Sequence, residues 1–140
     1  MKKLLATLPL LAAIPNALAG PQEMQPGLWE ITSRMEMPGM PKMAPQVMRH
    51  CYTKKDLEDN KKAVPQSGDK NCEMKDYKLQ GNTATWTMEC KGEAAMTGTG
   101  TMTFGAQSYT GSMKSRMKQG GKTMEMNQSW SAKRVGDCKQ

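Results

Sequence analysis

Histidine and phenylalanine are nearly absent from this chain: each occurs once, and all aromatic residues together make up 5% of the sequence. A hydrolase triad would have to use the single histidine, His50, and no G-x-S-x-G nucleophile elbow occurs. The H-E-x-x-H, P-loop and G-x-G-x-x-G motifs are missing as well. We therefore expect a protein that is not an enzyme and that needs no organic cofactor.

Dense basic runs are also missing. Lys and Arg are scattered among Asp and Glu, although the formal net charge is +7. The few aromatic residues do not alternate with Arg as they do in a base-stacking platform. We therefore expect no nucleic-acid partner. Beyond the N-terminus no segment approaches the roughly 20 apolar residues that a membrane-spanning helix needs, so no membrane span is expected.

The first nineteen residues have the pattern of a signal peptide. "MKK" gives a positive start, "LLATLPLLAAI" an apolar stretch and "ALA" a small-x-small cleavage site. Cleavage after Ala19 would remove residues 1–19 and leave residues 20–140 as a single exported domain. The short leader is typical of bacteria, so we expect the protein in the periplasm.

Four cysteines, Cys51, Cys72, Cys90 and Cys138, lie in the predicted mature part. An even number in a small exported domain predicts two disulfides. Four cysteines allow three connectivities, and the sequence alone does not choose among them. We favour Cys72–Cys90, which flanks a predicted hairpin, together with Cys51–Cys138, which would tie the chain end to the helix-bearing half.

Alternating apolar and polar residues predict β-strands over most of the chain. Five to seven strands are predicted, over residues 27–37, 72–80, 83–91, 94–104, 108–118 and 122–135, with residues 46–52 as a candidate for a further short strand. Trp29 and Trp86 occupy apolar positions of such strands, so both are expected to be buried. The predicted fold is mainly β: an antiparallel meander that forms a strongly curved sheet or an up-and-down barrel.

One short surface helix is predicted over about residues 53–64. Thr53 suits the N-cap, and Asp56 three residues later completes a variant of the capping box. Leu57, Ala63 and Val64 offer only a narrow apolar stripe.

The hairpin at Gly81-Asn82 admits two registers. A two-residue loop would set Leu79 opposite Ala84, whereas a three-residue loop would set Cys72 opposite Cys90. The two registers place opposite faces of the strand in the core. A β-bulge would satisfy both, and the sequence leaves this open.

Several short motifs resemble a widespread family of small exported bacterial domains of unknown function. They are "PGLWEIT" (26–32), "MPGMP" (37–41), "CYTKKDL" (51–57), the hairpin between Cys72 and Cys90 with Trp86, and "KRVGDC" (133–138). The resemblance implies an exported, cysteine-bridged β domain. It assigns no catalytic residue.

Methionine is the abundant residue, with 15 in the chain. The predicted strand faces direct nine of them inward: Met35, Met37, Met88, Met96, Met102, Met113, Met117, Met124 and Met126. Flexible thioethers fill irregular space and adapt to partners, so they serve either as packing or as a deformable apolar site. The candidate residues for lining such a site are Trp29, Met88, Met102, Met113, Met117, Met124, Met126 and Trp130.

The segment "MEMPGMPKMAPQVM" (35–48) holds five methionines and three prolines. Cu(I) is a soft ion that prefers thioether and thiolate ligands. The candidate ligands are Met37, Met40 and Met43, followed by Met48 and His50. The alternative is a loop whose methionines form an apolar lid. The sequence thus predicts a periplasmic domain that binds an apolar ligand or an envelope protein, with a Cu(I)-binding protein as the alternative.

Overall fold

The computed structural model describes residues 24–59, 61–64, 69–93 and 95–139. The predicted signal peptide, residues 1–19, lies outside the described residues. The elements in chain order are β1 (Gly27–Glu36), β2 (Gln46–Tyr52), α1 (Lys54–Glu58), β3 (Cys72–Gln80), β4 (Thr83–Cys90), β5 (Ala95–Phe104), β6 (Ser108–Gln119) and β7 (Lys122–Gly136). The seven strands are the upper end of the five to seven that were predicted, and their ends agree with the predicted ones within a few residues.

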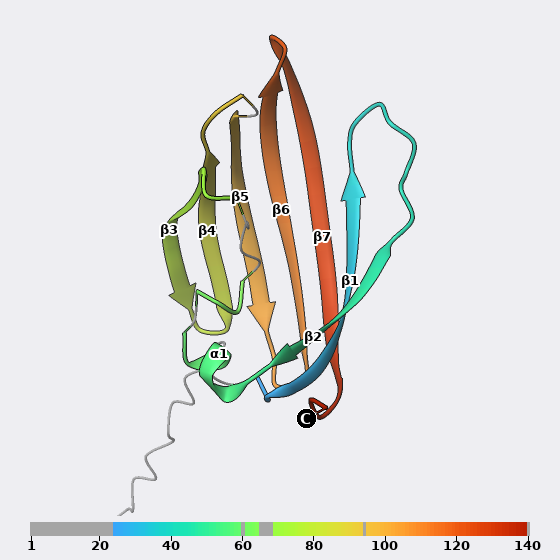
Figure 1. Cartoon of the computed structure of the whole chain (residues 1–140), viewed down its shortest axis with the longest axis vertical. Coiled ribbons are helices and arrows are strands. Elements are labelled where there is room, and N and C mark those ends of the chain that lie inside the picture. Colours follow the sequence, from blue (N-terminus) through green and yellow to red (C-terminus); the bar gives the residue numbers. More distant parts are fainter. Residues whose placement is uncertain (1–23, 60, 65–68, 94, 140) are drawn as a thin grey trace, which may run out of the picture.

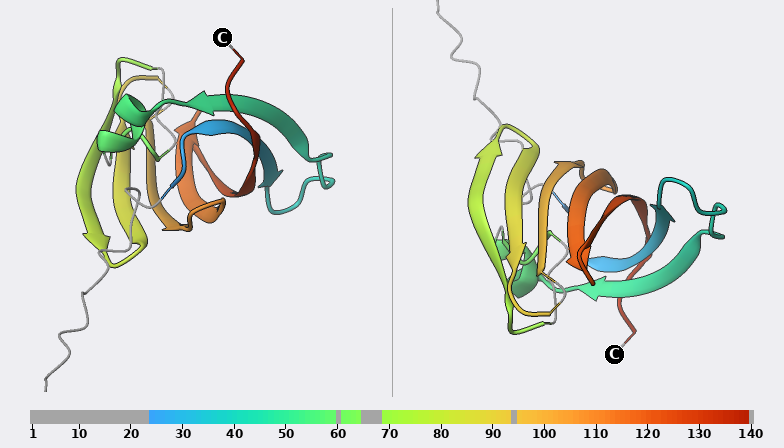
Figure 2. Two further views of the ribbon diagram at one scale, coloured as in Figure 1. Left: turned by 90° about the horizontal axis from the view of Figure 1, so that it is seen from below. Right: turned by 90° about the horizontal axis from the view of Figure 1, so that it is seen from above.

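The strands form one antiparallel sheet in the order β2-β1-β7-β6-β5-β4-β3. Strands β3 to β7 form a meander. The β1–β2 hairpin extends the sheet beyond β7, because β1 pairs with β7 (Figure 1). The sheet curls strongly about its long axis (Figure 2). It does not close, because β2 and β3 have no strand on their outer sides in the described part of the chain. The curved sheet is therefore the correct one of the two predicted architectures.

The β3–β4 hairpin resolves the open register with a bulge. Leu79 lies opposite Ala84 near the turn, and Cys72 lies opposite Cys90 at the other end. The register shifts between Lys75 and Lys78, where Asp76 adopts a positive φ of 51°. One extra residue in β3 thus keeps the apolar positions on one face at both ends.

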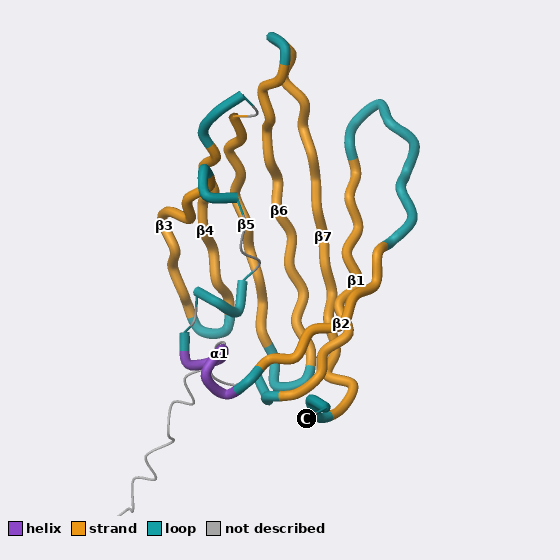
Figure 3. The backbone as a smooth tube through the Cα atoms, in the orientation of Figure 1, coloured by secondary structure: helices purple, strands orange, loops and turns teal. Residues whose placement is uncertain are grey.

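The helix is shorter than predicted, since α1 spans Lys54–Glu58 instead of residues 53–64 (Figure 3). The predicted capping box is confirmed: the Thr53 hydroxyl accepts from the Asp56 N–H at 3.2 Å, and the Asp56 carboxylate accepts from the Thr53 N–H at 2.9 Å. The helix ends at Asp59, whose carboxylate accepts from the Lys61 N–H at 3.1 Å. A side chain that bonds the backbone two residues ahead favours a turn over another helical turn.

The core lies on the concave face, under α1. Leu57 of the helix and Ala63 and Val64 after it are buried against the sheet. Trp29 and Trp86 are 0% and 2% exposed, as predicted.

Aromatic rings fill the end of the core that carries the β1–β2 hairpin. Trp29 stacks on Tyr109 with ring centroids 5.5 Å apart. The hydroxyls of Tyr52 and Tyr109 share a hydrogen bond of 3.2 Å, and burial raises the pKa of both phenols, so both stay neutral.

Both predicted disulfides are present. Cys72–Cys90 crosses the β3–β4 hairpin, and Cys51–Cys138 joins β2 to the C-terminal segment. The second bridge fixes the free edge strand β2 to the end of the chain.

Candidate ligand-binding site

The concave face towards the β6–β7 turn is covered with methionine side chains. Residues that lie opposite each other on paired strands share a face of the sheet. One such row, from β4 to β7, contains Met88, Gly98, Ser115 and Met126. We name this surface the methionine trough and define it by Met35, Met74, Met88, Met96, Met113, Met117 and Met126.

The trough is only partly covered. Met88 is 5% exposed, whereas the other six methionines are half-buried. At its β1 side, Met35 and Ser33 line a hollow of about 150 Å³ together with Met43 of the β1–β2 loop. The trough is therefore an apolar surface with side chains that remain free to move.

Charge on the concave face lies at its two ends, at Lys122 next to the Met117–Met124 pair and at Arg134 opposite Trp29. The strand positions between these ends that are aligned with the trough carry none. These aligned positions are Cys72, Leu79, Ala84, Trp86, Cys90, Gly98, Gly100, Met102, Gly111, Ser115, Met124, Gln128, Trp130 and Ser33. The few polar groups bond one another: the Gln128 amide donates to Ser33 Oγ at 3.2 Å, and Ser115 Oγ donates to the Met126 carbonyl at 3.5 Å.

Most charged and threonine side chains of the strands lie on the opposite face. There, Thr99, Lys114 and Arg116 line a polar hollow of about 550 Å³, and Arg116 pairs with Glu125 at 3.1 Å. The two faces of one sheet thus differ sharply in polarity.

Two tryptophans lie flat on the concave face because glycines face them. A Cβ at Gly100 would lie 2.3 Å from Cε2 of Trp86, and a Cβ at Gly111 would lie 2.3 Å from Nε1 of Trp130. Both distances are far below van der Waals contact, so only glycine admits the rings. The two indoles come together at the deep end of the trough, with ring centroids 6.3 Å apart.

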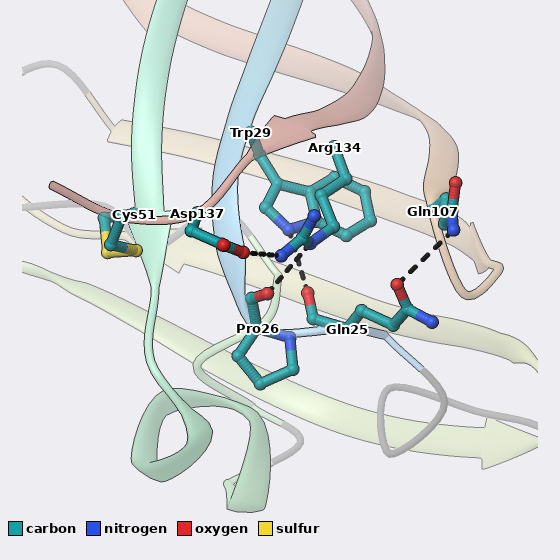
Figure 4. Close-up of polar contacts among 8 residues, drawn as sticks. Gln25, Pro26, Trp29, Cys51, Gln107, Arg134 and Asp137 are labelled. Carbon is teal, nitrogen blue, oxygen red and sulfur yellow. Dashed lines mark hydrogen bonds and ion pairs between the residues drawn. A yellow bond between two sulfur atoms is a disulfide. The ribbon is translucent and has the colours of Figure 1, made fainter.

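The indole N–H groups of Trp86 and Trp130 are buried and have no hydrogen-bond partner among the described residues. Trp29 differs, because its Nε1 donates to the Gln25 carbonyl at 3.1 Å (Figure 4). The same segment is held by Arg134, whose Nε donates to the Pro26 carbonyl at 2.9 Å.

The predicted lining residues separate into two groups. Trp29 and Met102 are 0% exposed and belong to the packed core, and Trp130 is 6% exposed. The remaining ones, apart from buried Met88, are open: Met113, Met117 and Met126 are half-buried and Met124 is 41% exposed. Met117 lies opposite Met124 in the β6–β7 hairpin.

The candidate copper ligands are spread over the β1–β2 hairpin. Met40, Met43 and Met48 are 57%, 46% and 58% exposed, and Met37 is half-buried. Exposed His50 packs edge-on against Tyr52, with ring centroids 4.5 Å apart.

The loop does not bring its three first-ranked thioethers into one hollow. Met37 and Met40 form a turn, closed by a 3.1 Å hydrogen bond, and share a hollow with Lys42. Met43 instead faces Met35. No group of three or more His, Cys, Asp or Glu side chains suited to a metal occurs in the described ranges.

Trp86, Gln128 and Ser115 were not among the residues predicted to line the site. The glycines at alternate positions of β5 could have indicated the position of Trp86, because a strand residue without a side chain leaves room for a large ring on the neighbouring strand. No sequence pattern indicates that two indole N–H groups lack acceptors among the described residues, because that depends on how distant side chains pack.

The described residues include no helix with the length and apolarity to cross a bilayer. No curated protein matches the chain, and no solved structure does. One family model matches residues 24–138, and its description is "Protein of unknown function (DUF3617)". The match covers both disulfides, all seven strands and the methionine trough. The chain therefore belongs to the DUF3617 family of proteins of unknown function.

Proposed function

We propose that this protein is a non-enzymatic binding domain of the periplasm and that its methionine trough takes a lipophilic ligand. The observation that carries the proposal is the combination of partial burial and neutrality in the trough. Six thioethers remain half-buried on a face whose charges lie only at its ends, at Lys122 and Arg134, among the paired strand residues. Covering such a face removes apolar surface from water, at roughly 25 cal/mol per Å².

The choice of side chain supports binding of a flexible ligand. Methionine has three rotatable bonds, so a surface made of methionine adapts to ligands of variable shape. A core made of Leu, Ile and Phe would pack more uniquely but would adapt less. The floor beneath the trough is rigid by contrast, because Trp86 and Trp130 rest on strand backbone at Gly100 and Gly111.

The proposal is tested by titrating the protein with a lipophilic ester and following the methyl signals of ¹³C-methyl-methionine by NMR. We expect the trough signals to shift and the Met40 and Met48 signals to stay in place. The double variant Met117→Gln/Met126→Gln should weaken binding at least tenfold, since it puts two amides on the apolar face.

The matched control is Met40→Gln/Met48→Gln, which makes the same chemical change at residues that are 57% and 58% exposed. It should bind as the wild type does. Equal affinity of both double variants, or no shift of any trough methyl, would refute the proposal.

A Cu(I) site in the β1–β2 hairpin is a second candidate function. The observation that favours it is the exposure of Met40, Met43 and Met48, which leaves three soft donors accessible on one hairpin. Both disulfides are closed, so no thiolate competes for the ion. The cation of Lys42 beside Met37 and Met40 works against it.

Anaerobic titration with Cu(I), read by native mass spectrometry, tests this candidate. We expect one ion per chain, no competition by Zn(II) or Mg(II), and loss of binding in Met40→Leu/Met43→Leu. Met117→Leu/Met126→Leu is the matched control and should retain the ion. A wild-type protein that takes no Cu(I), or a Met40→Leu/Met43→Leu variant with unchanged affinity, would eliminate the site.

A further inference from the structure

Two buried indole N–H groups without acceptors lie at the deep end of the methionine trough. Trp86 and Trp130 are 2% and 6% exposed, and neither Nε1 has a hydrogen-bond partner among the described residues. A buried donor that loses its hydrogen bond to water costs roughly 1–3 kcal/mol. Phenylalanine would fill much of the same space without that cost.

We propose that the ligand of the trough is a neutral acyl chain, held as an ester or amide, whose oxygen atoms accept from Nε1 of Trp86 and Nε1 of Trp130. This inference rests on the proposed function, since it names the ligand class of the same site. The chain would lie along the thioethers, and the carbonyl group would meet the two indoles.

The sheet register connects the two parts of this site. Trp86 lies opposite Gly100, and Gly100 lies opposite Met113, so the indole and a trough thioether are neighbours on the floor. Met113 extends along the strand, because a Cβ at Gly98 would lie 2.5 Å from its Cε. Rotation of this one flexible side chain would open the floor beside Trp86.

Charge decides between an ester and a free carboxylate. The strand residues aligned with the two indoles carry no positive group to pair with a carboxylate, and Lys122 lies beyond Met117 and Met124 at the other end of the trough. An ionised group buried without a partner is strongly disfavoured, whereas a carbonyl that accepts a hydrogen bond is not. The site therefore fits an uncharged headgroup oxygen.

Indole NMR gives a direct test, because the chain holds its own control. The protein, labelled with ¹⁵N-tryptophan and ¹³C-methyl-methionine, is titrated with 1-monooctanoylglycerol and separately with octanoate at neutral pH. Trp86→Phe and Trp130→Phe assign the indole signals. Trp29 already donates to the Gln25 carbonyl at 3.1 Å, so its signal reports only indirect changes.

With the ester we expect the Nε1–H signals of Trp86 and Trp130 to move downfield, while the Trp29 signal stays. Octanoate should bind at least tenfold more weakly than the ester. Trp86→Phe should lower affinity for the ester by roughly 5- to 30-fold, the loss of one hydrogen bond. The wild-type spectra test the idea even if a Phe variant does not fold.

The outcomes separate the two proposals. Shifted trough methyls with unmoved indole signals, or equal binding of octanoate and ester, would overturn the acyl-carbonyl assignment and leave the lipophile-binding trough standing. Unmoved methyls and unmoved indoles with both probes would overturn both proposals.

Discussion

Replacing Gly100 with alanine tests the packing of the trough floor. The new Cβ would lie 2.3 Å from both Cε2 and Cζ2 of Trp86, which is 2% exposed and has little room to retreat. Inserting a methyl group into a packed core typically costs about 1–3 kcal/mol. The backbone at Gly100 is not in the left-handed region, so the loss of unfolded-state freedom offsets about 0.4–1 kcal/mol of that cost. We expect a net loss of about 1–2 kcal/mol in the free energy of unfolding.

Urea unfolding followed by far-ultraviolet circular dichroism measures this loss. Gly98→Ala is the matched control on the same strand. Its Cβ meets Met113 Cε at 2.5 Å, which is the movable end of a flexible side chain, although Ser115 Cβ at 3.0 Å is also close. We expect Gly98→Ala to cost less than Gly100→Ala does.

A double-mutant cycle assigns the cost to the indole. In a Trp86→Leu background the ring over Gly100 is gone, so Gly100→Ala should become neutral or stabilising. The expected coupling free energy is about 2 kcal/mol, within the range for residues in contact. Gly100→Ala with wild-type stability would show that Trp86 does not lie on that strand. Should Trp86→Leu not fold, the single substitutions at Gly98 and Gly100 still decide the question.

Three further predictions concern the helix cap and the disulfides. Thr53→Ala removes the acceptor for the Asp56 N–H and should cost about 1 kcal/mol in urea unfolding, whereas Thr53→Ser should not. The hydrogen bond from the Thr53 hydroxyl holds the pKa of Asp56 below its usual range. The stability from this hydrogen bond is therefore fully present above pH about 4 and is lost as the pH falls through the lowered pKa. An acid titration of Thr53→Ala should show a smaller loss, because the Thr53 N–H still donates to the Asp56 carboxylate. Replacing both Cys51 and Cys138 with serine opens a loop with a sequence separation of 87, against 18 for the β3–β4 bridge. This double replacement should lower the free energy of unfolding by about 4–5 kcal/mol, whereas replacing Cys72 and Cys90 should lower it by about 3 kcal/mol. Equal thermal midpoints of the two double variants would contradict the chain-entropy reasoning.

Local patterns in the sequence were enough to predict the strands. Alternation depends only on neighbouring residues, so it gave the bounds of β1 and β5 and the facing of Met117 and Met124. Whether the two edges of the sheet meet and close a barrel could not be predicted from alternation. Closure depends on whether β2 reaches β3 across the curl, and no local pattern reports that distance.

Competition between local groups explains where the predicted helix ends, and it shapes the methionine loop as well. The predicted helix continued past Asp59, but there a side-chain hydrogen bond to the Lys61 N–H replaced the next helical bond. The spacing of Met37, Met40 and Met43 would allow a three-sulfur site, which stays a prediction; in the structure Met37 and Met40 close a turn and Met43 shares a hollow with Met35. Sequence spacing shows which residues are close along the chain, but it does not show the direction in which the backbone places their side chains.

The short helix explains why the trough stays open. Five helical residues rise only about 8 Å, whereas the 12 residues of β6 extend about 40 Å. A helix over all of residues 53–64 would have reached about 18 Å, still less than half of the strand. The cover provided by α1, Ala63 and Val64 therefore ends over the tryptophan core, and the thioethers beyond it remain half-buried. A sheet face that needed cover only for stability would have been served by a longer helix and a more uniform core. A half-buried face made of flexible thioethers, next to two indoles without an acceptor in the described part of the chain, supports the proposal that a ligand supplies the missing cover.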